Sequence, residues 1–381
     1  MKLFFTDAEF CMEGVRRPGI PFLCDRTMEL VDAPNRYLRY VATVRGRTQA
    51  PSTWRTYGDH LMEFFAFLED NELLWTHATT PAMAAWRDAM VERQCSLNTV
   101  NQRLRGVHAF YKWAERHGMV TATPFATQDV QVGRPMPFLG HVDASGGRAR
   151  ANELTLRTFA PLPKFLRLDK AVRFLEALTP ARARLMGYLM LLTGMRREEA
   201  VALDYRALPD PAGHDPDKAL PMVLDGRMTP TKGSKERTVM VPFDLAAALD
   251  SYFTFDRHPL QRRFARQHGH QTTRLFLSRR GEELSVKSLN HAFAQASRRT
   301  GITCHPHMLR HTFGTYELLR MQRDHGESQA LLWVKDRMGH SSISTTESYV
   351  HAADLIRHDA VDGYQRDLCE ALRHGHTQAE A

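Results

Sequence analysis

The sequence predicts a mostly helical protein of two domains, with a small antiparallel β-sheet in the second domain. Three observations support this fold class. The chain has 381 residues, and a single hydrophobic core rarely grows beyond about 250 to 300 residues. Apolar residues recur at helical spacing along most of the chain. The pattern of short strands separated by turn residues is confined to residues 222–241.

The composition is that of a globular protein with an excess of positive charge. Hydrophobic residues make up 43% and charged residues 25% of the chain, which is close to the average for folded domains and far from a disordered sequence. The formal net charge of +8 favours a polyanionic partner such as nucleic acid. Solvated Lys and Arg on the surface explain such a charge equally well. The motifs therefore have to identify the partner.

The cysteines and the start of the chain argue against a zinc site, a signal peptide and a membrane span. No CxxC pair and no Cys/His spacing typical of zinc ligands occurs. The five cysteines lie far apart: Cys11, Cys24, Cys95, Cys304 and Cys369. Asp7 and Glu9 follow the first residues too closely for an apolar leader. We expect a protein of the reducing cytoplasm, with no metal and no membrane partner.

Residues 29–126 are expected to form a helical domain. Its clearest apolar stripe consists of Trp54, Tyr57, Leu61, Phe64, Phe65 and Leu68. Thr80 is the expected N-cap of a further helix, because Pro81 suits the first turn. Basic residues between the stripes suit contacts with phosphate or with water equally well: Arg36, Arg39, Arg45, Arg47, Arg55, Arg103, Arg105 and Lys112. Residues 1–28 form an N-terminal segment that either binds DNA as an arm or packs on the helices.

Residues 127–163 are rich in Gly and Pro and lack a sustained period, which predicts a linker. A second domain with a C-terminal helical tail is expected over residues 164–381. Asp169 is a candidate N-cap for its first helix. The apolar residues 185–192 are too few to span a membrane and predict a buried helix that ends near Gly194.

A three-stranded antiparallel meander is predicted in the second domain, after a loop at residues 205–219 that is rich in Pro, Asp and Gly. The expected strands are 222–224, 227–231 and 237–241. They are joined by the turns Asp225-Gly226 and Lys232-Gly233-Ser234-Lys235.

Four short segments carry the residue types that phosphoryl transfer needs. They are Thr193-Gly194-Met195-Arg196-Arg197-Glu198-Glu199, Lys232-Gly233-Ser234-Lys235-Glu236-Arg237, His307-Met308-Leu309-Arg310-His311, and Gly339-His340 followed after nine positions by Tyr349. The reaction needs a nucleophile, cations for the nonbridging oxygens and a proton for the leaving oxygen. Guanidinium groups can hold two phosphate oxygens at once, and a tyrosine hydroxyl can serve as the nucleophile.

In this order the four segments resemble the catalytic domain of the tyrosine recombinase (phage integrase) family over residues 164–355. Residues 29–126 resemble that family's core DNA-binding domain. The resemblance implies a two-domain clamp around double-stranded DNA that cuts and rejoins strands through a 3′ phosphotyrosyl bond. The sequence departs from the family at His305, Met338 and Gly314, where alanine is usual in place of Gly314. None of these three is a catalytic position.

The resemblance assigns catalytic roles to six positions: Arg196, Lys232, His307, Arg310, His340 and Tyr349. The two arginines match the residues that clamp the scissile phosphate, and the two histidines match residues that donate further hydrogen bonds to it. Tyr349 attacks phosphorus, while Tyr316 and Tyr364 lack the Gly-His segment in front. Lys232 is the general acid for the 5′ oxygen, and Lys235 in the same turn is the competing candidate.

Two further residues are expected to support the site without taking part in the chemistry. Glu199 lies one helical turn after Arg196 and could hold its guanidinium group. His311 follows Arg310 directly, so we expect its side chain to point to another face of the helix, as a structural partner.

The implied reaction needs no cofactor, because the phosphotyrosyl bond conserves the energy for rejoining. The resemblance implies a homotetramer on two DNA duplexes, with a monomer as a candidate free state and accessory DNA-bending or directionality proteins as candidate partners. The loop at 205–219, the long linker and the residues after Tyr349 favour an integrase or transposase of a mobile element. Two alternatives remain: a topoisomerase-like DNA-relaxing enzyme, and a catalytically silent DNA-binding regulator. The complete catalytic set argues against the regulator.

Overall fold

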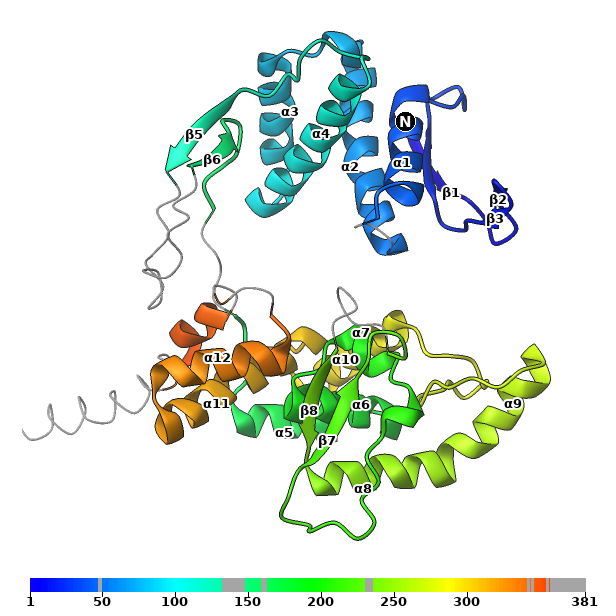
Figure 1. Cartoon of the computed structure of the whole chain (residues 1–381), viewed down its shortest axis with the longest axis vertical. Coiled ribbons are helices and arrows are strands. Elements are labelled where there is room, and N and C mark those ends of the chain that lie inside the picture. Colours follow the sequence, from blue (N-terminus) through cyan, green and yellow to red (C-terminus); the bar gives the residue numbers. More distant parts are fainter. Residues whose placement is uncertain are drawn as a thin grey trace, which may run out of the picture. The chain divides into compact units, whose positions relative to one another are not determined.

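The computed structural model describes residues 1–46, 50–131, 148–158, 163–229, 236–340, 343, 346–353 and 356. The chain divides into two compact units, Met1–Ala160 and Pro161–Ala381. Figure 1 shows that the first unit is built mainly of helices and that the second combines helices with a small sheet.

The helices of the first unit enclose an aromatic core. They are α1 (Asp32–Thr43), α2 (Pro51–Asp70), the short 3-10 helix η1 (Trp75–His77), α3 (Thr80–Glu92) and α4 (Leu97–Arg116). Phe64 of α2 packs on Trp86 of α3 with ring centroids 5.0 Å apart, and on Tyr111 of α4 at 5.9 Å. The predicted stripe of α2 is thus its buried face. Such aromatic pairs bury large areas in favourable edge-to-face geometry.

The predicted cap of α3 was wrong by one residue. Thr79 is the N-cap, and its hydroxyl accepts the backbone N–H of Ala82 at 3.4 Å. Thr80 is already in the first turn, and its hydroxyl donates to the carbonyl of Pro124 at 3.0 Å. The sequence Thr79-Thr80-Pro81 offers two hydroxyls, and only the fold decides which of them caps the helix.

The N-terminal segment packs on the helices of the first unit. β1 (Lys2–Phe5) pairs antiparallel with β4 (Pro21–Cys24), and β2 (Cys11–Met12) pairs with β3 (Val15–Arg16). Asn35 of α1 holds β4, because its side chain accepts from the N–H of Leu23 at 2.7 Å and donates to its carbonyl at 2.8 Å. On α2, a Cβ added at Gly58 would lie 2.8 Å from Cβ of Pro21. β4 therefore lies in direct contact with α2.

Two parts of the segment that was predicted as a linker form a pair of strands. β5 (Thr127–Gln131) pairs antiparallel with β6 (Arg148–Asn152), while residues 132–147 lie outside the described part of the chain. After β6 the chain is fastened to α4 by Asn101. This side chain donates to the carbonyl of Leu156 at 2.8 Å and accepts its N–H at 2.9 Å.

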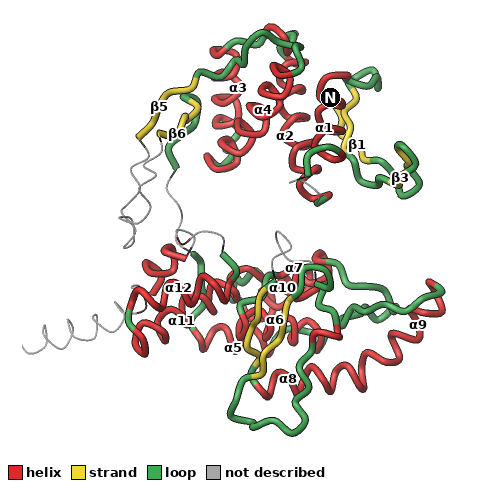
Figure 2. Tube along the Cα trace, in the orientation of Figure 1, coloured by secondary structure: helices red, strands yellow, loops and turns green. Residues whose placement is uncertain are grey.

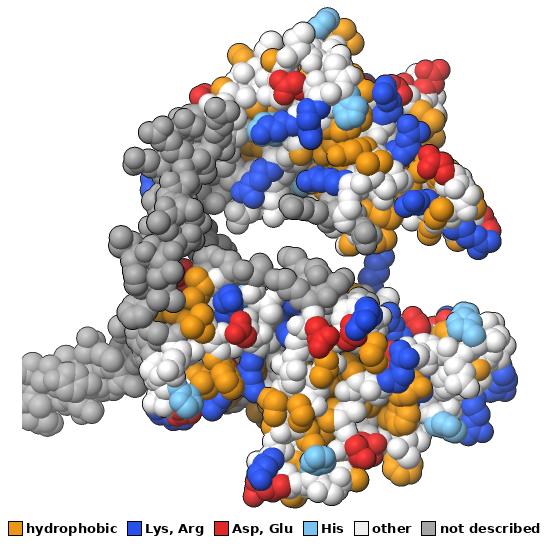
Figure 3. All heavy atoms as spheres, viewed as in Figure 1, with side chains coloured by type: hydrophobic (Ala, Val, Ile, Leu, Met, Phe, Trp, Pro, Cys, Tyr) orange, Lys and Arg blue, Asp and Glu red, His pale blue; other side chains and the backbone are white. Residues whose placement is uncertain are grey.

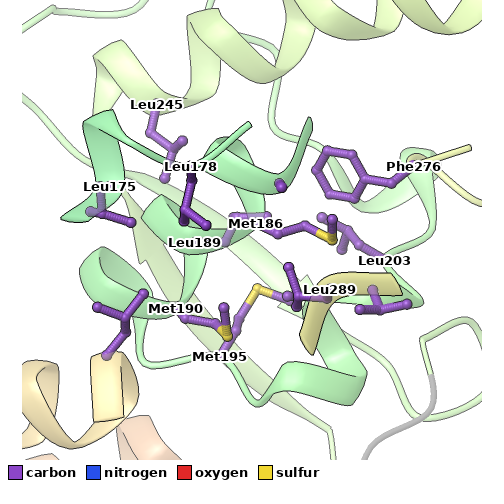
Figure 4. Close-up of a cluster of buried hydrophobic side chains, with 14 of the residues drawn as sticks. Leu175, Leu178, Met186, Leu189, Met190, Met195, Leu203, Leu245, Phe276 and Leu289 are labelled. Atoms are coloured by element: carbon purple, nitrogen blue, oxygen red, sulfur yellow. The ribbon is translucent and has the colours of Figure 1, made fainter. Parts of the chain in front are cut away.

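The second unit packs around helix α6 (Ala181–Thr193), the predicted buried helix. Leu189 and Met190 of α6 have no exposed surface. Figure 4 shows these side chains together with Leu175, Leu178, Leu203 and others. The surrounding elements are α5 (Leu168–Glu176), α7 (Arg197–Val201), η2 (Tyr205–Ala207), β7 (Leu220–Leu224), β8 (Arg237–Val241), α8 (Phe243–Ser251), the π-helical segment η3 (Tyr252–Arg257), α9 (His258–His268), α10 (Val286–Thr300), α11 (Pro306–His325) and α12 (Glu327–Met338). Gly194 ends α6 with φ of 68°, as the sequence predicted.

The predicted cap of α5 was also wrong. Arg167 is the N-cap residue, and no side chain caps this helix end. Asp169 lies inside the first turn, where a carboxylate interacts favourably with the helix dipole. Its effect on the helix is therefore electrostatic.

The predicted meander has two strands in the described residues, β7 and β8, which pair antiparallel from Leu220↔Val241 to Leu224↔Arg237 (Figure 2). Residues 227–229 do not form the expected middle strand. The N–H groups of Met228 and Thr229 both donate to the carbonyl of Asp225, which closes a turn. Residues 230–235, the rest of that strand and the predicted turn, lie outside the described residues.

Within the described part of the chain, no helix combines the length and the apolar character that crossing a membrane requires.

Candidate active site

Arg196 lies where α6 gives way to α7, directly after the turn formed by Gly194 and Met195. Its Nη2 donates to the carbonyl of Gly339 at 2.9 Å, and its Nη1 donates to Oε1 of Glu199 at 3.0 Å. Its backbone N–H donates to the other carboxylate oxygen of Glu199 at 2.7 Å. A side chain held from two directions has little rotamer freedom left. Arg196 is therefore preorganised to receive an anion.

Glu199 is shared between two arginines. It is 1% exposed, and its Oε1 accepts from Nη1 of Arg237 at 2.8 Å, while Oε2 accepts from Nη2 of the same residue. Burial on its own would raise the pKa of this carboxyl, but the hydrogen bonds and charges of Arg237 and Arg196 outweigh burial and lower the pKa to about 2. The carboxylate is ionised at neutral pH and holds both guanidinium groups.

Arg310 is the most deeply buried cation of the cluster, at 2% exposure. It extends from α11 and donates through Nη1 to the carbonyl of Gly194 and through Nη2 to the carbonyl of Met338 at 2.5 Å. Burial, and then the charge of Arg196, lower its pKa to about 9. It is still charged at neutral pH. Two carbonyls at helix ends thus fix this guanidinium without neutralising it.

Tyr349 lies beside these cations and is 2% exposed. Its hydroxyl is 2.8 Å from Nδ1 of His311. Burial raises the pKa of the phenol to about 12, although the charges of Arg310 and Arg196 act in the opposite direction. The phenol is therefore protonated at neutral pH, and it needs both a proton acceptor and positive charge to react as a nucleophile.

His340 covers the ring of Tyr349. The two rings are parallel within 3°, with centroids 6.0 Å apart. Nδ1 of His340 lies 3.0 Å from Oγ1 of Thr346, a residue with no exposed surface. Burial and the charges of Arg310 and Arg196 lower the pKa of His340 to about 3, so its ring is neutral at pH 7.

His307 and His311 lie one turn apart on α11, with ring centroids 4.3 Å apart in an edge-to-face arrangement. Burial and the charge of Arg310 lower the pKa of His307. Burial and the neighbouring His307 lower that of His311 to about 4. We expected His311 to point away from the cluster. Instead, it contacts the hydroxyl of Tyr349.

The structure thus brings together five of the six predicted catalytic residues and both predicted supporting residues. These are Arg196, His307, Arg310, His340 and Tyr349, with Glu199 and His311. Lys232 and its competitor Lys235 lie outside the described residues. A cleft of about 800 Å³ opens beside Arg196 and His340. Further basic side chains line it: Arg237, Lys335 and Arg337.

Sequence reasoning missed Arg237, although this residue ends the Lys-Gly-Ser-Lys-Glu-Arg segment that was singled out. Its side chain is 8% exposed and lies between Glu199 and Gly339. A basic residue at the start of a predicted strand gives no signal of burial, because the strand pattern does not tell which buried carboxylate the residue meets. The sequence likewise gives no sign that Thr346 is buried and contacts His340.

Within the described residues, no group of three or more His, Cys, Asp or Glu side chains is arranged to hold a metal ion.

Comparison with known sequences matches both units. The phage integrase family matches residues 164–355, and the N-terminal SAM-like domain of phage integrases matches residues 35–118. Tyrosine recombinase XerC of Mycobacterium tuberculosis is 30% identical over 325 residues, which are 82% of this chain and 92% of that protein. Tyrosine recombinase XerC of Oceanobacillus iheyensis is 27% identical over 331 residues, 84% of this chain and 92% of that protein.

Solved structures agree in fold. XerH site-specific recombinase bound to palindromic difH substrate superposes with a TM-score of 0.56 at 17% identity, over 84% of this chain and 82% of that one. A lambda integrase dimer bound to a COC′ core site gives a TM-score of 0.54 at 14% identity, over 82% and 75% of the two chains. The fold is that of the two-domain tyrosine recombinases. From its two domain matches, its XerC relatives and its fold, the chain belongs to the phage integrase family, the tyrosine site-specific recombinases.

Proposed function

We propose that this recombinase cuts and rejoins DNA by transferring one strand to Tyr349. The phenolic oxygen bonds to phosphorus, and the bond from phosphorus to the 5′ oxygen breaks. A 3′ phosphotyrosyl bond then holds the strand until a 5′ hydroxyl from the partner duplex reverses the reaction. Atoms and charges balance without a nucleotide cofactor.

One observation supports this proposal above all others. The phenol of Tyr349 is buried in a cluster whose two guanidinium groups, Arg196 and Arg310, both lower its pKa against the effect of burial. The same two groups can bind the nonbridging oxygens of a phosphate. Each guanidinium is planar and can donate two hydrogen bonds at once to these negatively charged oxygens. The proposed nucleophile and the cations that would stabilise the transition state therefore lie in the same site.

Lys232 is our candidate for the general acid. The described strand β8 begins five positions later, at Arg237, and its first side chain is bound to Glu199. The start of β8 is thereby linked through Glu199 to Arg196, and Lys232 lies only five positions before it in the sequence. The pKa of a free lysine is near 10.4. Proton donation at neutral pH therefore depends on the surrounding arginines and the DNA.

The first unit is the proposed DNA-binding partner of the catalytic unit. Arg39, Arg105 and Lys112 are exposed on its helices, and Figure 3 shows Lys and Arg side chains spread over its visible face. Other basic residues are engaged within the unit: Arg36 pairs with Asp32 at 3.6 Å, and Arg103 with Glu63 at 3.5 Å. We expect the exposed basic residues to contact DNA phosphates and so to determine how strongly the DNA affinity falls as the salt concentration rises.

Recombination requires two duplexes, so we propose four copies of the chain on two DNA sites in the cytoplasm, at the nucleoid. One of the related structures is a lambda integrase tetramer bound to a Holliday junction. The loop at residues 205–219 and the residues beyond Tyr349 favour integration, excision or transposition of a mobile element. The relatives named XerC favour a second candidate, recombination of sites on the host chromosome. Accessory DNA-bending or directionality proteins fit either role.

The test starts from a library of nicked duplexes with a randomised core. Wild-type protein is incubated with the library, complexes that survive denaturation are recovered, and their DNA is sequenced. We expect a defined cleavage site. Plasmids that carry two copies of this site are expected to yield recombinant products. Relaxation of plasmids without recombinants would indicate the topoisomerase-like alternative, and binding without any adduct would indicate the silent regulator.

The position of the selected site in the source genome separates the two biological roles. A site at the ends of an element that encodes this chain supports integration, excision or transposition. A single chromosomal site remote from the gene supports the XerC-like role.

A further inference from the structure

His311 contacts the atom that is proposed to attack phosphorus. Its Nδ1 lies 2.8 Å from the hydroxyl oxygen of Tyr349, and the ring centroids of the two residues are 5.6 Å apart. The hydroxyl oxygen and the ring nitrogen are thus at the distance of a strong hydrogen bond. The roles assigned to the six catalytic positions do not say which group accepts the phenol proton. The lysine supplies a proton to the leaving oxygen, and the arginines cannot accept one. The neutral rings of His307 and His340 could accept it, but the ring nitrogen that the structure places at hydrogen-bond distance from the phenol oxygen is Nδ1 of His311.

The helix places His311 for this contact. Successive residues of an α-helix point about 100° apart, so Arg310 and His311 serve different neighbours. Arg310 reaches the carbonyls of Gly194 and Met338. His311 reaches Tyr349, and its ring also makes an edge-to-face contact with His307, at 4.3 Å between centroids. The imidazole is therefore oriented as well as close.

Charged and titratable groups face His311 from two segments of the chain. They are His307 and Arg310 on its own helix, with His340 and Tyr349 from the segment after α12. Burial and the neighbours His307 and Arg310 lower the pKa of His311 to about 4. A neutral ring that carries its proton on Nε2 presents a free lone pair on Nδ1 to the hydroxyl of Tyr349.

We propose that His311 is the general base that accepts the phenol proton of Tyr349 during cleavage. This inference rests on the proposed function, in which Tyr349 is the nucleophile. As the oxygen–phosphorus bond forms, the proton moves to Nδ1 of His311, and the 5′ oxygen leaves with a proton from the general acid. Rejoining returns the proton from His311 to the phenolic oxygen.

Binding of DNA makes this proton transfer easier. The scissile phosphate brings negative charge next to the ring, and a nearby opposite charge favours the protonated imidazole. The acidity of the phenolic oxygen also rises as it bonds to phosphorus. Both effects act only in the complex that reacts, which is where catalysis needs them.

The first arm of the test separates a base from a positioning residue. In His311→Asn, the side-chain oxygen can replace Nδ1 as a hydrogen-bond acceptor, but it cannot take a proton. The single-turnover rate of adduct formation is measured on the nicked duplex selected by the wild-type protein. We expect a loss of about 10²- to 10⁴-fold. His291→Asn, on the surface of α10, is the matched control and should keep the wild-type rate.

The second arm changes the acidity of the phenol. Trifluorotyrosine, whose hydroxyl ionises near neutral pH, is incorporated at position 349. We expect it to restore much of the rate in His311→Asn, because an ionised phenol needs no base, and to change the wild-type rate little. His311→Gln provides the same test if circular dichroism shows that the Asn variant is unfolded.

A wild-type rate in both His311 variants would overturn the proposal. So would a defect that trifluorotyrosine leaves untouched, since that result assigns His311 a structural role only. If the wild-type protein forms no adduct with any duplex, the proposed function itself fails. These outcomes are distinct from one another.

Discussion

Arg196 and Glu199 are joined by two hydrogen bonds across the first turn of α7, one from the guanidinium at 3.0 Å and one from the backbone N–H at 2.7 Å. The carboxylate therefore fixes both the side chain and the backbone of Arg196, the residue that is proposed to bind phosphate. Because Arg237 binds the same carboxylate at 2.8 Å, the contact also links α7 to the sheet. A substitution of Glu199 is therefore expected to affect both the stability of the fold and the proposed reaction.

The first prediction concerns acid stability. The pKa of Glu199 is about 2 in the folded protein and near 4.3 in an unfolded chain. Its ionised form stabilises the fold fully above about pH 5, and this stabilisation is lost as the pH falls towards 2. We expect Glu199→Gln to lower the free energy of unfolding by about 3 kcal/mol at pH 7. In urea titrations, the gap between variant and wild type should shrink between pH 5 and pH 3. A gap that does not change with pH would contradict the assigned charge.

The second prediction concerns Arg237, which acts through Glu199. Arg237→Ala leaves the buried carboxylate with a single arginine, so Arg196 loses its precise orientation. We expect adduct formation to slow roughly 10- to 100-fold while duplex affinity, measured by fluorescence anisotropy, stays near wild type. Arg237→Lys should recover part of the rate, since an ammonium group can still reach the carboxylate. Arg227→Ala, at an exposed turn of the same sheet, is the control. Equal defects in Lys and Ala variants would argue against positioning through charge.

The third prediction concerns Gly314, where the family usually has alanine. A Cβ added here would lie 3.0 Å from two ring carbons of Tyr349 and 2.8 Å from Sδ of Met338. The methionine can move, but the phenol ring is held by His311 and His340. We expect Gly314→Ala to destabilise the catalytic unit by about 1 to 3 kcal/mol, measured by chemical denaturation. Gly46→Ala, which meets nothing within 4 Å, should leave stability almost unchanged. An unchanged stability in Gly314→Ala would show that the ring is not confined.

The fourth prediction concerns metal ions. Arg196 and Arg310 carry positive charge at neutral pH and can stabilise the pentavalent phosphate directly. We expect the yield of covalent adduct in excess chelator to equal the yield in magnesium, scored on denaturing gels. Loss of the adduct on chelation, with recovery after magnesium is added back, would assign the charge stabilisation to a metal.

The sequence was sufficient for the helices with strong apolar stripes. The spacing of Trp54, Leu61 and Leu68 indicated the buried face of α2, and the apolar run before Gly194 indicated the buried helix α6. It was insufficient for short strands such as β1, because four residues are too few for a period. The middle strand of the meander failed for a different reason. Asp225 closes a turn with Met228 and Thr229, and such local hydrogen bonding competes with strand pairing.

The site was predictable to the extent that its residues stand in short motifs. Arg196, Arg310 and Tyr349 could be selected from segments whose order matters more than any one of them. The contacts of His311 and Arg237 could not be predicted, because they depend on how α11, α7 and β8 pack together. A sequence motif gives the identity of a side chain. Its hydrogen-bond partner is decided by the tertiary fold.

The most direct test of the central claim is to identify the residue that is covalently bound to DNA. The adduct trapped on the selected nicked duplex is digested with protease and nuclease, and the nucleotide-bearing peptide is sequenced by mass spectrometry. We expect the 3′ phosphate on Tyr349 and no adduct in Tyr349→Phe. An adduct on another residue, or one that persists in the Phe variant, would contradict the assignment of the nucleophile.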